Sequence, residues 1–325
     1  MKAILVQNDQ SLKWDVVDDP IVGTDDVLIK VIAAGVNRAD LMQRAGDYPP
    51  PPGNPEWMGL EVAGEIVQTG ENASLYRHVG EKVCALLGGG GYAEYVSVRW
   101  DMCIRIPNNC SMIDAAAMPE AFCTAYLNLF MEGGLKKGQT LLMHAGASGL
   151  ASVVIPMAKA FGARVITTVI QDEFIPKIKP LGADMIINTL NTDIADVLKN
   201  ELENGHPIDL AIDCLGGEMM GRCLPYLQFR GRWIMIAALA GQMTEIDLKN
   251  VYVRNIRIIG STLRSRTNNT KAEILHELEE KIWPMIENGT MRKPTIYRTF
   301  PMIEADCAHE MLKEGKSAGK IVLTV

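Results

Sequence analysis

The chain has 325 residues, of which 48% are hydrophobic, 22% charged and 6% aromatic, a composition typical of folded globular proteins and not of disordered ones. Its 32 Lys and Arg residues are outnumbered by 39 Asp and Glu residues, which gives a formal net charge of −7. We find no basic stripe that would neutralise a phosphate backbone, so no nucleic-acid partner is expected. At about 150 residues per domain, the length predicts two domains.

The seven cysteines are scattered along the chain and form no C-x-x-C pair. An odd number without paired spacing is typical of a reducing compartment. The start, MKAILVQNDQ, has no apolar run long enough for a signal peptide, and no segment approaches the about 18 apolar residues of a membrane span. We therefore expect a cytoplasmic protein with no membrane partner.

Short apolar runs separated by Gly, Pro and Asp occupy residues 1 to about 119, for example at 27–32 and 93–98. This pattern predicts a mostly β domain, folded over as an antiparallel barrel. PPPPG at 49–53 and GGGG at 88–91 interrupt it, and both are typical of loops.

From about residue 138 the pattern changes to alternating strands and helices. Predicted strands stand at 141–143 and 164–169, and further buried runs follow at 185–187, 210–212 and 233–236, with amphipathic stretches between them. This spacing predicts an α/β domain with a parallel sheet covered on both faces. After a last strand at 256–260, the sequence predicts a long helix from about 269 to 287. A final strand at 319–323 could return to the first domain.

A glycine-rich turn at residues 144–151 lies where a strand ends and a helix begins, which is the context of a dinucleotide-binding fingerprint. Gly146 is expected to allow the tight turn, Gly149 the close approach of backbone to pyrophosphate, and Ala151 the close packing of helix on strand. The helix start offers free N–H groups and a positive dipole end to phosphates. We therefore predict dinucleotide binding. The expected cofactor contacts in this turn are Gly146, Ala147, Ser148, Gly149 and Leu150.

The residues after the second strand of this domain usually decide between NAD and NADP, and here they leave the choice open. Residues 169–171, of which Gln171 is a candidate cofactor contact, contain no acid that could hold a ribose 2′-hydroxyl, although Asp172 follows. Lys177 and Lys179 could reach a 2′-phosphate, or they could be solvated helix lysines.

Further cofactor contacts are expected after two later strands. Ligands of open α/β sheets bind outside the carboxyl ends of the strands. Cys214 and Leu215 follow the run at 210–212, and Ala237 and Leu239 follow the run at 233–236. We predict that these four residues contact the cofactor.

Several motifs are spread over nearly the whole chain: AAGVNRADL at 33–41, GDYPPPPG at 46–53, GLEVAG at 59–64, GGYAEY at 90–95, PEAF at 119–122, GASG at 146–149, GSTLR at 260–264 and GKIV at 319–322. Together they resemble the medium-chain dehydrogenase/reductase superfamily and, within it, the zinc-free quinone oxidoreductases of the zeta-crystallin-like type. The resemblance implies a GroES-like, mostly β barrel domain of residues 1–119 and 262–325. It also implies an inserted Rossmann dinucleotide-binding domain, a doubly wound parallel sheet, of residues 120–261.

The resemblance also bears on metal binding. Zinc-containing members of the superfamily place a Cys at the position of Asn37 and a His at that of Leu60, and a catalytic zinc needs three N, S or O ligands. Cys84, Cys103 and Cys110 are too few and too spread for a four-cysteine structural zinc. We therefore expect no metal.

The resemblance implies reduction of quinones or other activated double bonds, such as enones, by hydride transfer from NAD(P)H. Without a Lewis acid to stabilise an alkoxide, reduction of an electron-poor acceptor is the expected direction, and placement of the reactants is the expected mechanism. NADPH is the expected cofactor. NADH stays open, because Ile170, Gln171 and Phe174 replace the Gly-Ser pair and the Lys that cradle the 2′-phosphate in close relatives.

Two alternative functions remain. One is a non-catalytic NADPH-binding protein comparable to the crystallins of this superfamily. The other is an enoyl-thioester reductase, which would need a long channel and a basic docking patch for the carrier, and the sequence shows neither.

The resemblance assigns roles to individual residues. Tyr48 is expected to face the nicotinamide and the substrate, where it could hydrogen-bond the acceptor oxygen, and Asn37 could hydrogen-bond substrate or cofactor. Thr124 matches a position that contacts the nicotinamide, and Arg264 could touch the cofactor phosphates or ribose. Glu120 would lie near the former metal site with a raised pKa, or act as a helix-start acid. The plain alternatives are a packing Tyr, a turn Asn, a Thr bonded to its own helix and a surface Arg.

An exposed apolar sheet edge at residues 256–259 invites pairing with a second copy. We therefore expect a homodimer that acts on a small molecule.

Overall fold

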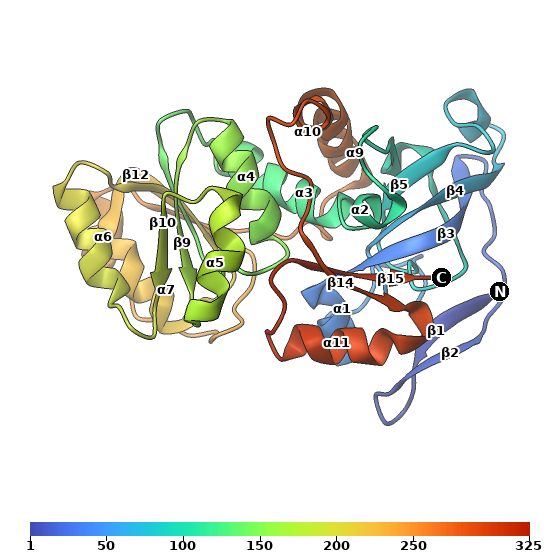
Figure 1. The fold of residues 1–325 in the computed structure, drawn as a ribbon, viewed down its shortest axis with the longest axis horizontal. Helices are drawn as coiled ribbons and strands as arrows, with labels where there is room; N and C mark the ends of the chain where they lie inside the picture. The colour runs from blue at the N-terminus through green and yellow to red at the C-terminus, as the bar shows by residue number, and fades with distance from the viewer. The chain divides into compact units, whose positions relative to one another are not determined.

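The computed structural model describes residues 1–325 and divides into two compact units (Figure 1). Unit 1 comprises Met1–Cys123 and Arg264–Val325, and unit 2 comprises Thr124–Leu263. The expected domain boundaries, after residues 119 and 261, lie a few residues earlier. The expected class is confirmed, because unit 1 is built on mostly antiparallel strands and unit 2 on a parallel sheet with helices.

Unit 1 contains a seven-stranded sheet in the order β14-β15-β3-β4-β5-β7, with β6 paired to β3, and a separate pair of strands, β1 and β2. Along β3, Val27, Ile29 and Val31 are buried and alternate with more exposed residues, as expected of a sheet with one covered face. The strands are β1 (Lys2–Val6), β2 (Leu12–Val16), β3 (Asp26–Val36), β4 (Glu61–Thr69), β5 (Lys82–Leu86), β6 (Tyr95–Arg99), β7 (Cys103–Arg105), β14 (Ile296–Pro301) and β15 (Lys320–Thr324).

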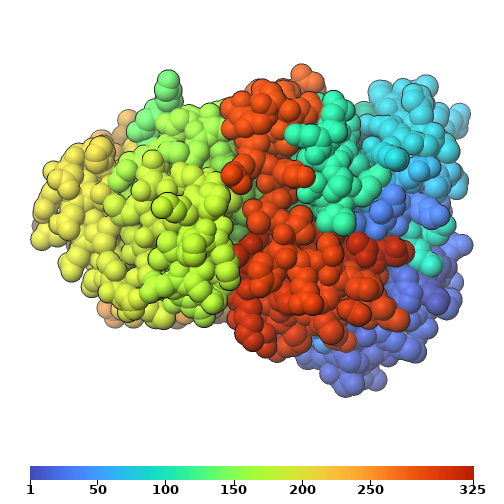
Figure 2. All heavy atoms as spheres, in the orientation of Figure 1, coloured from blue at the N-terminus to red at the C-terminus, as the bar shows by residue number.

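Strand β15 joins the end of the chain to its beginning. It lies antiparallel to β3, with Ile321 opposite Val36 and Thr324 opposite Ala33, and parallel to β14. The predicted return of the last strand to the first domain is confirmed. Figure 2 shows the result, in which residues near the C-terminus (red) lie beside residues near the N-terminus (blue) on one surface of unit 1.

The long helix predicted from about residue 269 to 287 is present but not uniform. It begins as α9 (Asn268–Glu277), passes through a π-helical segment, η7 (Leu278–Ile282), and ends as α10 (Trp283–Glu287). Such a segment absorbs one extra residue per turn, and it lies directly before Pro284, which cannot donate a helical hydrogen bond. The other helices of unit 1 are α1 (Arg38–Arg44), η1 (Ala73–Leu75), η2 (Trp100–Met102), α2 (Met112–Ala116), η8 (Met302–Glu304) and α11 (Ala305–Lys313), and α3 (Pro119–Tyr126) crosses into unit 2.

Unit 2 is a doubly wound α/β domain. Its six parallel strands follow the order β10-β9-β8-β11-β12-β13, which is the strand order of dinucleotide-binding Rossmann folds. The strands are β8 (Thr140–Met143), β9 (Arg164–Val169), β10 (Met185–Asn188), β11 (Ile208–Asp213), β12 (Leu227–Met235) and β13 (Arg257–Gly260). Every buried run predicted for this domain lies on one of them, except that Ile236 follows the end of β12.

Helices cover both faces of this sheet. Figure 1 shows α4 and α5 on one side and α6 and α7 on the other. Because both faces are covered, β8 is buried at every position, and its apolar residues do not alternate with polar ones. The helices of unit 2 are η3 (Leu127–Met131), α4 (Ala151–Ala160), η4 (Asp172–Phe174), α5 (Ile175–Ile178), η5 (Lys179–Leu181), α6 (Ile194–Glu203), α7 (Gly217–Cys223), η6 (Leu224–Tyr226) and α8 (Leu248–Val253).

Strand β13 pairs only with β12 and ends the sheet. Arg257 and Ile258 on it are exposed. None of the helices in the structure combines the length and the apolar character that a bilayer crossing requires.

Candidate active site

The glycine-rich turn of unit 2 joins β8 to α4 at the carboxyl edge of the sheet. The neighbouring strand β9 holds it in place, because Gly146 N donates to Thr168 O at 2.7 Å and Ala145 N donates to Thr168 Oγ1 at 3.2 Å. Ala145 has a φ of 55°, a left-handed conformation that residues other than Gly rarely adopt. The left-handed residue of the turn is Ala145, which precedes Gly146.

Gly146 is required here for a different reason. A Cβ atom built at this position would lie 2.4 Å from Thr167 Oγ1. Thr167 is fully buried, and its hydroxyl donates to Met143 O at 2.7 Å, so it has no room to move. Gly146 therefore permits the close approach of the turn to β9.

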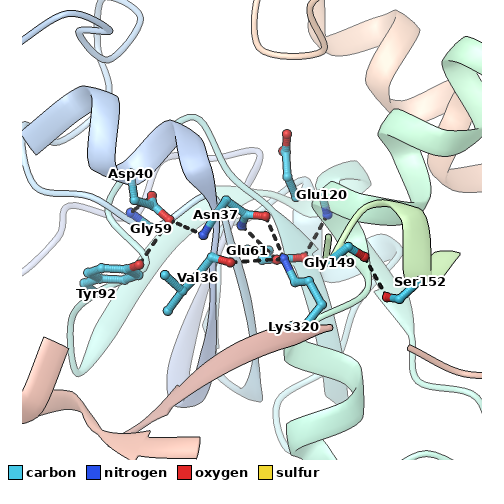
Figure 3. A network of polar contacts seen from close by, with 10 residues as sticks. All are labelled: Val36, Asn37, Asp40, Gly59, Glu61, Tyr92, Glu120, Gly149, Ser152 and Lys320. Atoms are coloured by element: carbon cyan, nitrogen blue, oxygen red, sulfur yellow. Dashed lines mark hydrogen bonds and ion pairs between the residues drawn. The ribbon is translucent and has the colours of Figure 1, made fainter. Parts of the chain in front are cut away.

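The start of α4 is fixed to the turn by two serine side chains. Ser148 Oγ accepts from Ala151 N at 3.1 Å, and Ser152 Oγ donates to Gly149 O at 2.7 Å (Figure 3). The next two amides of α4, Ser152 N and Val153 N, donate to Ser148 O and Leu150 O, so the start of the helix attracts an anion through the positive end of its dipole. The turn thus has the form of a phosphate-binding site. The predicted contacts Gly146, Ala147, Ser148, Gly149 and Leu150 all lie in it.

Two loops lie at the same edge of the sheet, after β11 and β12. Leu239 N donates to Cys214 O at 3.1 Å, and the next amide, at position 240, donates to Leu215 O at 2.8 Å. The structure therefore brings Cys214, Leu215 and Leu239 together, and Ala237 lies in the same loop as Leu239. Their contact with a cofactor stays a prediction.

The segment after β9 contains the candidate selector of the cofactor ribose. Gln171 is exposed. The carboxylate of Asp172 accepts from Asn188 Nδ2 at 2.7 Å and from Asn191 Nδ2 at 3.3 Å. Asp172, the acid nearest to the end of β9, is therefore already hydrogen-bonded by two asparagine side chains of unit 2. Lys177 Nζ lies 5.1 Å from the centre of the Phe174 ring.

Unit 1 contains a buried polar group that we name the Lys320 triad, consisting of Asn37, Glu61 and Lys320 (Figure 3). Lys320 Nζ donates to Glu61 Oε1 and to Asn37 Oδ1, both at 2.6 Å, and Asn37 Nδ2 donates to Glu61 Oε1 at 2.9 Å. The second oxygen of Glu61 accepts from Glu120 N at 2.9 Å. Each member of the triad thus bonds both others.

Burial makes the triad rigid. Glu61 is 0% and Lys320 3% exposed, and charges taken out of water are stable only when they are paired and hydrogen-bonded. Asn37 is engaged on both sides of its amide group, which leaves it one N–H and one oxygen lone pair. Those groups are held in a fixed orientation.

The residues of the triad do not fit a zinc ion. Leu60, at one expected ligand position, is apolar and buried. At the other, Asn37 is bound to the ammonium of Lys320, and this positive charge would repel a divalent cation. No three His, Cys, Asp or Glu side chains are grouped in the structure as a metal site would need.

Asp40 forms a second buried group beside the triad. Its carboxylate accepts from Asn37 N at 2.7 Å, from Gly59 N at 3.2 Å and from the Tyr92 hydroxyl at 3.0 Å. Burial raises the pKa of Asp40 to about 6, against the opposing effect of these hydrogen bonds. Asp40 therefore fixes the start of α1, at which Asn37 is the N-cap residue.

Arg264 holds Tyr48 in place. Its guanidinium lies 4.6 Å from the centre of the Tyr48 ring, and Nη1 donates to Tyr48 O at 2.9 Å. Nη2 donates to Gln43 Oε1 at 2.6 Å and to Gly88 O at 2.8 Å. Arg264 is only 9% exposed, so it is not a surface Arg, and it ties the proline-rich loop to the loop of glycines. Burial raises the pKa of Tyr48.

Two further ionisable groups lie near Arg264. Burial raises the pKa of Glu120 to about 7, and the neighbouring Glu61 carboxylate adds to this effect. Lys271 is buried and donates from Nζ to Arg264 O at 3.1 Å, and burial lowers its pKa. Thr124 lies further along α3, where its carbonyl accepts from Asn128 Nδ2 at 2.7 Å.

Sequence reasoning missed the part played by Glu61, Lys320 and Lys271. The first two lie in the motifs GLEVAG and GKIV, but 259 positions separate them, and their spacing gave no signal of a pair. The signal available was a charged residue directly before an apolar stretch, at the start of both β4 and β15.

Comparisons with known proteins agree with this architecture. Residues 23–108 match the alcohol dehydrogenase GroES-like domain, and residues 149–280 match the zinc-binding dehydrogenase family. A quinone oxidoreductase-like protein 2 homolog of Nematostella vectensis is 30% identical, with 93% of this chain and 82% of that protein covered. The human quinone oxidoreductase is 29% identical, with coverage of 94% and 90%. A mycobacterial protein solved in complex with NADPH is 25% identical with a TM-score of 0.87, and both chains are covered completely.

Proposed function

The chain belongs to the medium-chain dehydrogenase/reductase superfamily, and on that basis we propose that it is a zinc-independent NADPH-dependent reductase of quinones and enones. The Lys320 triad carries the proposal. It occupies a position where zinc-containing members need metal ligands, and its ammonium is incompatible with a metal ion. Without a Lewis acid, an acceptor that is already electron-poor is the suitable substrate.

The cofactor assignment is supported by the carboxyl edge of unit 2. The turn at 146–150 would hold the pyrophosphate, and the loops containing Leu215 and Leu239 would line the rest of the nucleotide. We prefer NADPH to NADH because Asp172, the acid that could bind a ribose 2′-hydroxyl, is engaged by Asn188 and Asn191. The mycobacterial relative was solved in complex with NADPH, which also supports NADPH as the cofactor. The reduced nicotinamide supplies the hydride.

The side chains of unit 1 are assigned to the acceptor. The Tyr48 hydroxyl is protonated at neutral pH, as phenols ordinarily are, and burial raises its pKa further, so it can donate a hydrogen bond to an acceptor oxygen. Arg264 fixes the loop that presents it. Asn37 contributes its remaining amide N–H in an orientation set by Lys320 and Glu61. In this mechanism the protein places the reactants and excludes water.

The experiment is to follow NADPH and NADH oxidation at the nicotinamide absorbance with ortho-quinones, para-quinones, enones and an enoyl thioester. We expect turnover with quinones or enones, with NADPH preferred, from protein whose zinc content is far below stoichiometric. Tight NADPH binding without turnover would instead indicate a binding protein of the crystallin kind. Turnover of the thioester alone would indicate an enoyl-thioester reductase, and zinc-dependent activity would refute the proposal.

A further inference from the structure

Unit 2 has a cavity at the edge of its sheet opposite to the glycine-rich turn. Its volume is about 390 Å³, and it is lined by Lys136, Gln139, Asp209, Phe229, Arg230, Gly231, Arg232 and Arg257. Gln139 directly precedes β8, and Asp209 and Arg257 lie at the amino ends of β11 and β13. The cavity therefore lies at the amino edge of the parallel sheet and is separate from the candidate cofactor edge.

A break in the strand pairing shapes this cavity. Leu227 on β12 lies opposite Ile208, but Arg232 lies opposite Leu210, so residues 228–231 bulge out of the ladder. Arg230 in the bulge has a φ of 61°, a left-handed conformation that a bulky residue rarely adopts. Bulges re-aim side chains and recur beside functional sites.

The cavity carries an excess of positive charge. Four cations, Lys136, Arg230, Arg232 and Arg257, line it together with one carboxylate, Asp209. That carboxylate accepts from Thr140 N at 2.8 Å and from Gln139 Nε2 at 3.3 Å. None of the four cations takes part in an ion pair of the structure.

Arg232 is the member with an unmet hydrogen-bonding need. Its Nε atom is buried and has no hydrogen-bond partner. It lies opposite Arg257 in the strand register, and burial together with the charge of Arg257 lowers the pKa of Arg232. A buried donor without a partner is costly. Since Arg232 and Arg257 both line the cavity, an anion bound there would offset the repulsion between them.

We propose that this cavity binds a small, multiply charged anion, either a phosphate-bearing molecule or a di- or tricarboxylate. Guanidinium groups bind both kinds of oxyanion through paired hydrogen bonds. The volume is within the range of small-molecule sites, and a concave pocket suits a small ligand better than an acidic protein surface. Phe229, 56% exposed, presents a ring at the cavity that a planar part of the ligand can stack on.

The test is calorimetric titration of the full chain, with its cofactor site saturated by NADPH, with inorganic pyrophosphate and, separately, with citrate, at constant ionic strength. We expect saturable binding of at least one probe at a stoichiometry of one. Arg232→Gln and Arg257→Gln are each expected to weaken it about tenfold or more, as the loss of a charged hydrogen bond does. Binding of pyrophosphate alone assigns the site to phosphates, and binding of citrate alone assigns it to carboxylates.

Lys199→Gln is the matched control, since it removes an exposed cation of α6 outside the cavity and should leave binding unchanged. Arg257 is exposed, so its variant keeps the test valid even if Arg232→Gln fails to fold. NADPH affinity, measured in parallel, should be the same in all variants that fold. Absence of saturable binding of both probes, or equal binding by the control and both arginine variants, would overturn the proposal.

Discussion

Replacing Glu120 by Gln should stabilise the protein, and only at a pH where the carboxyl group is ionised. Burial raises the pKa of Glu120 from 4.5 to about 7, so the folded state binds this proton more tightly than the unfolded chain does. The loss of folding stability caused by the charged carboxylate is therefore absent below pH 4.5, grows between pH 4.5 and 7, and is complete above pH 7.

The size of the effect follows from this difference in pKa. A rise from 4.5 to about 7 corresponds to about 3 kcal/mol of lost stability above pH 7. Gln has nearly the same shape and no charge, so Glu120→Gln should recover up to that amount at pH 8 and much less of it at pH 5.

The assay is urea unfolding of the wild-type protein and the variant at pH 5 and pH 8, with the midpoint and slope compared at each pH. Glu173→Gln is the control, because Glu173 is an exposed acid after β9 and its replacement should have little effect at either pH. A gain in stability of the same size at pH 5 and pH 8 would refute the reasoning, since it would show that the Glu120 carboxyl does not titrate in this range.

Three further predictions concern residues of the candidate active site. Tyr48→Phe should lower kcat for quinone reduction about tenfold or more and change NADPH affinity little, as measured by steady-state kinetics and by binding titration. An equal loss of kcat and of NADPH affinity would show instead that Tyr48 acts in cofactor binding. Lys320→Met should lower the free energy of unfolding, measured in urea, by about 3–5 kcal/mol, because it leaves the buried Glu61 carboxylate without its ion-pair partner. The double variant with Glu61→Gln should recover part of this loss of stability. Gly146→Ala should weaken NADPH binding in fluorescence titration, because the new methyl group would meet Thr167 Oγ1 at 2.4 Å; unchanged affinity would show that the turn can relax.

Much of unit 2 could be predicted from sequence because its strands are covered on both faces. Residues 141–143 and 165–169 are buried without alternation, and each run lies on a strand. The glycine-rich turn was located for the same reason, since it stands between a buried strand and an apolar helix. Local patterns of this kind depend on neighbours in the sequence.

Features that depend on distant residues could not be predicted. Glu61 and Lys320 meet only because β15 pairs with β3, which in turn pairs with β4. Gly146 is required because of Thr167 on another strand, whereas the sequence suggested a turn conformation. The basic cavity arises from a bulge in β12, and the sequence shows only separate Arg and Lys residues. Such contacts are set by register and topology.

The position of Lys320 on the last strand has a consequence for synthesis on the ribosome. Unit 2 is one continuous segment, Thr124–Leu263, so it can complete its sheet while later residues are still being translated. Unit 1 cannot, because its sheet and the partner of its buried Glu61 are delivered only when residues 320–324 emerge. Until then, residues 33–36 of β3 lack their neighbouring strand in the nascent chain. A chaperone that binds unpaired strand edges would therefore bind at this part of β3.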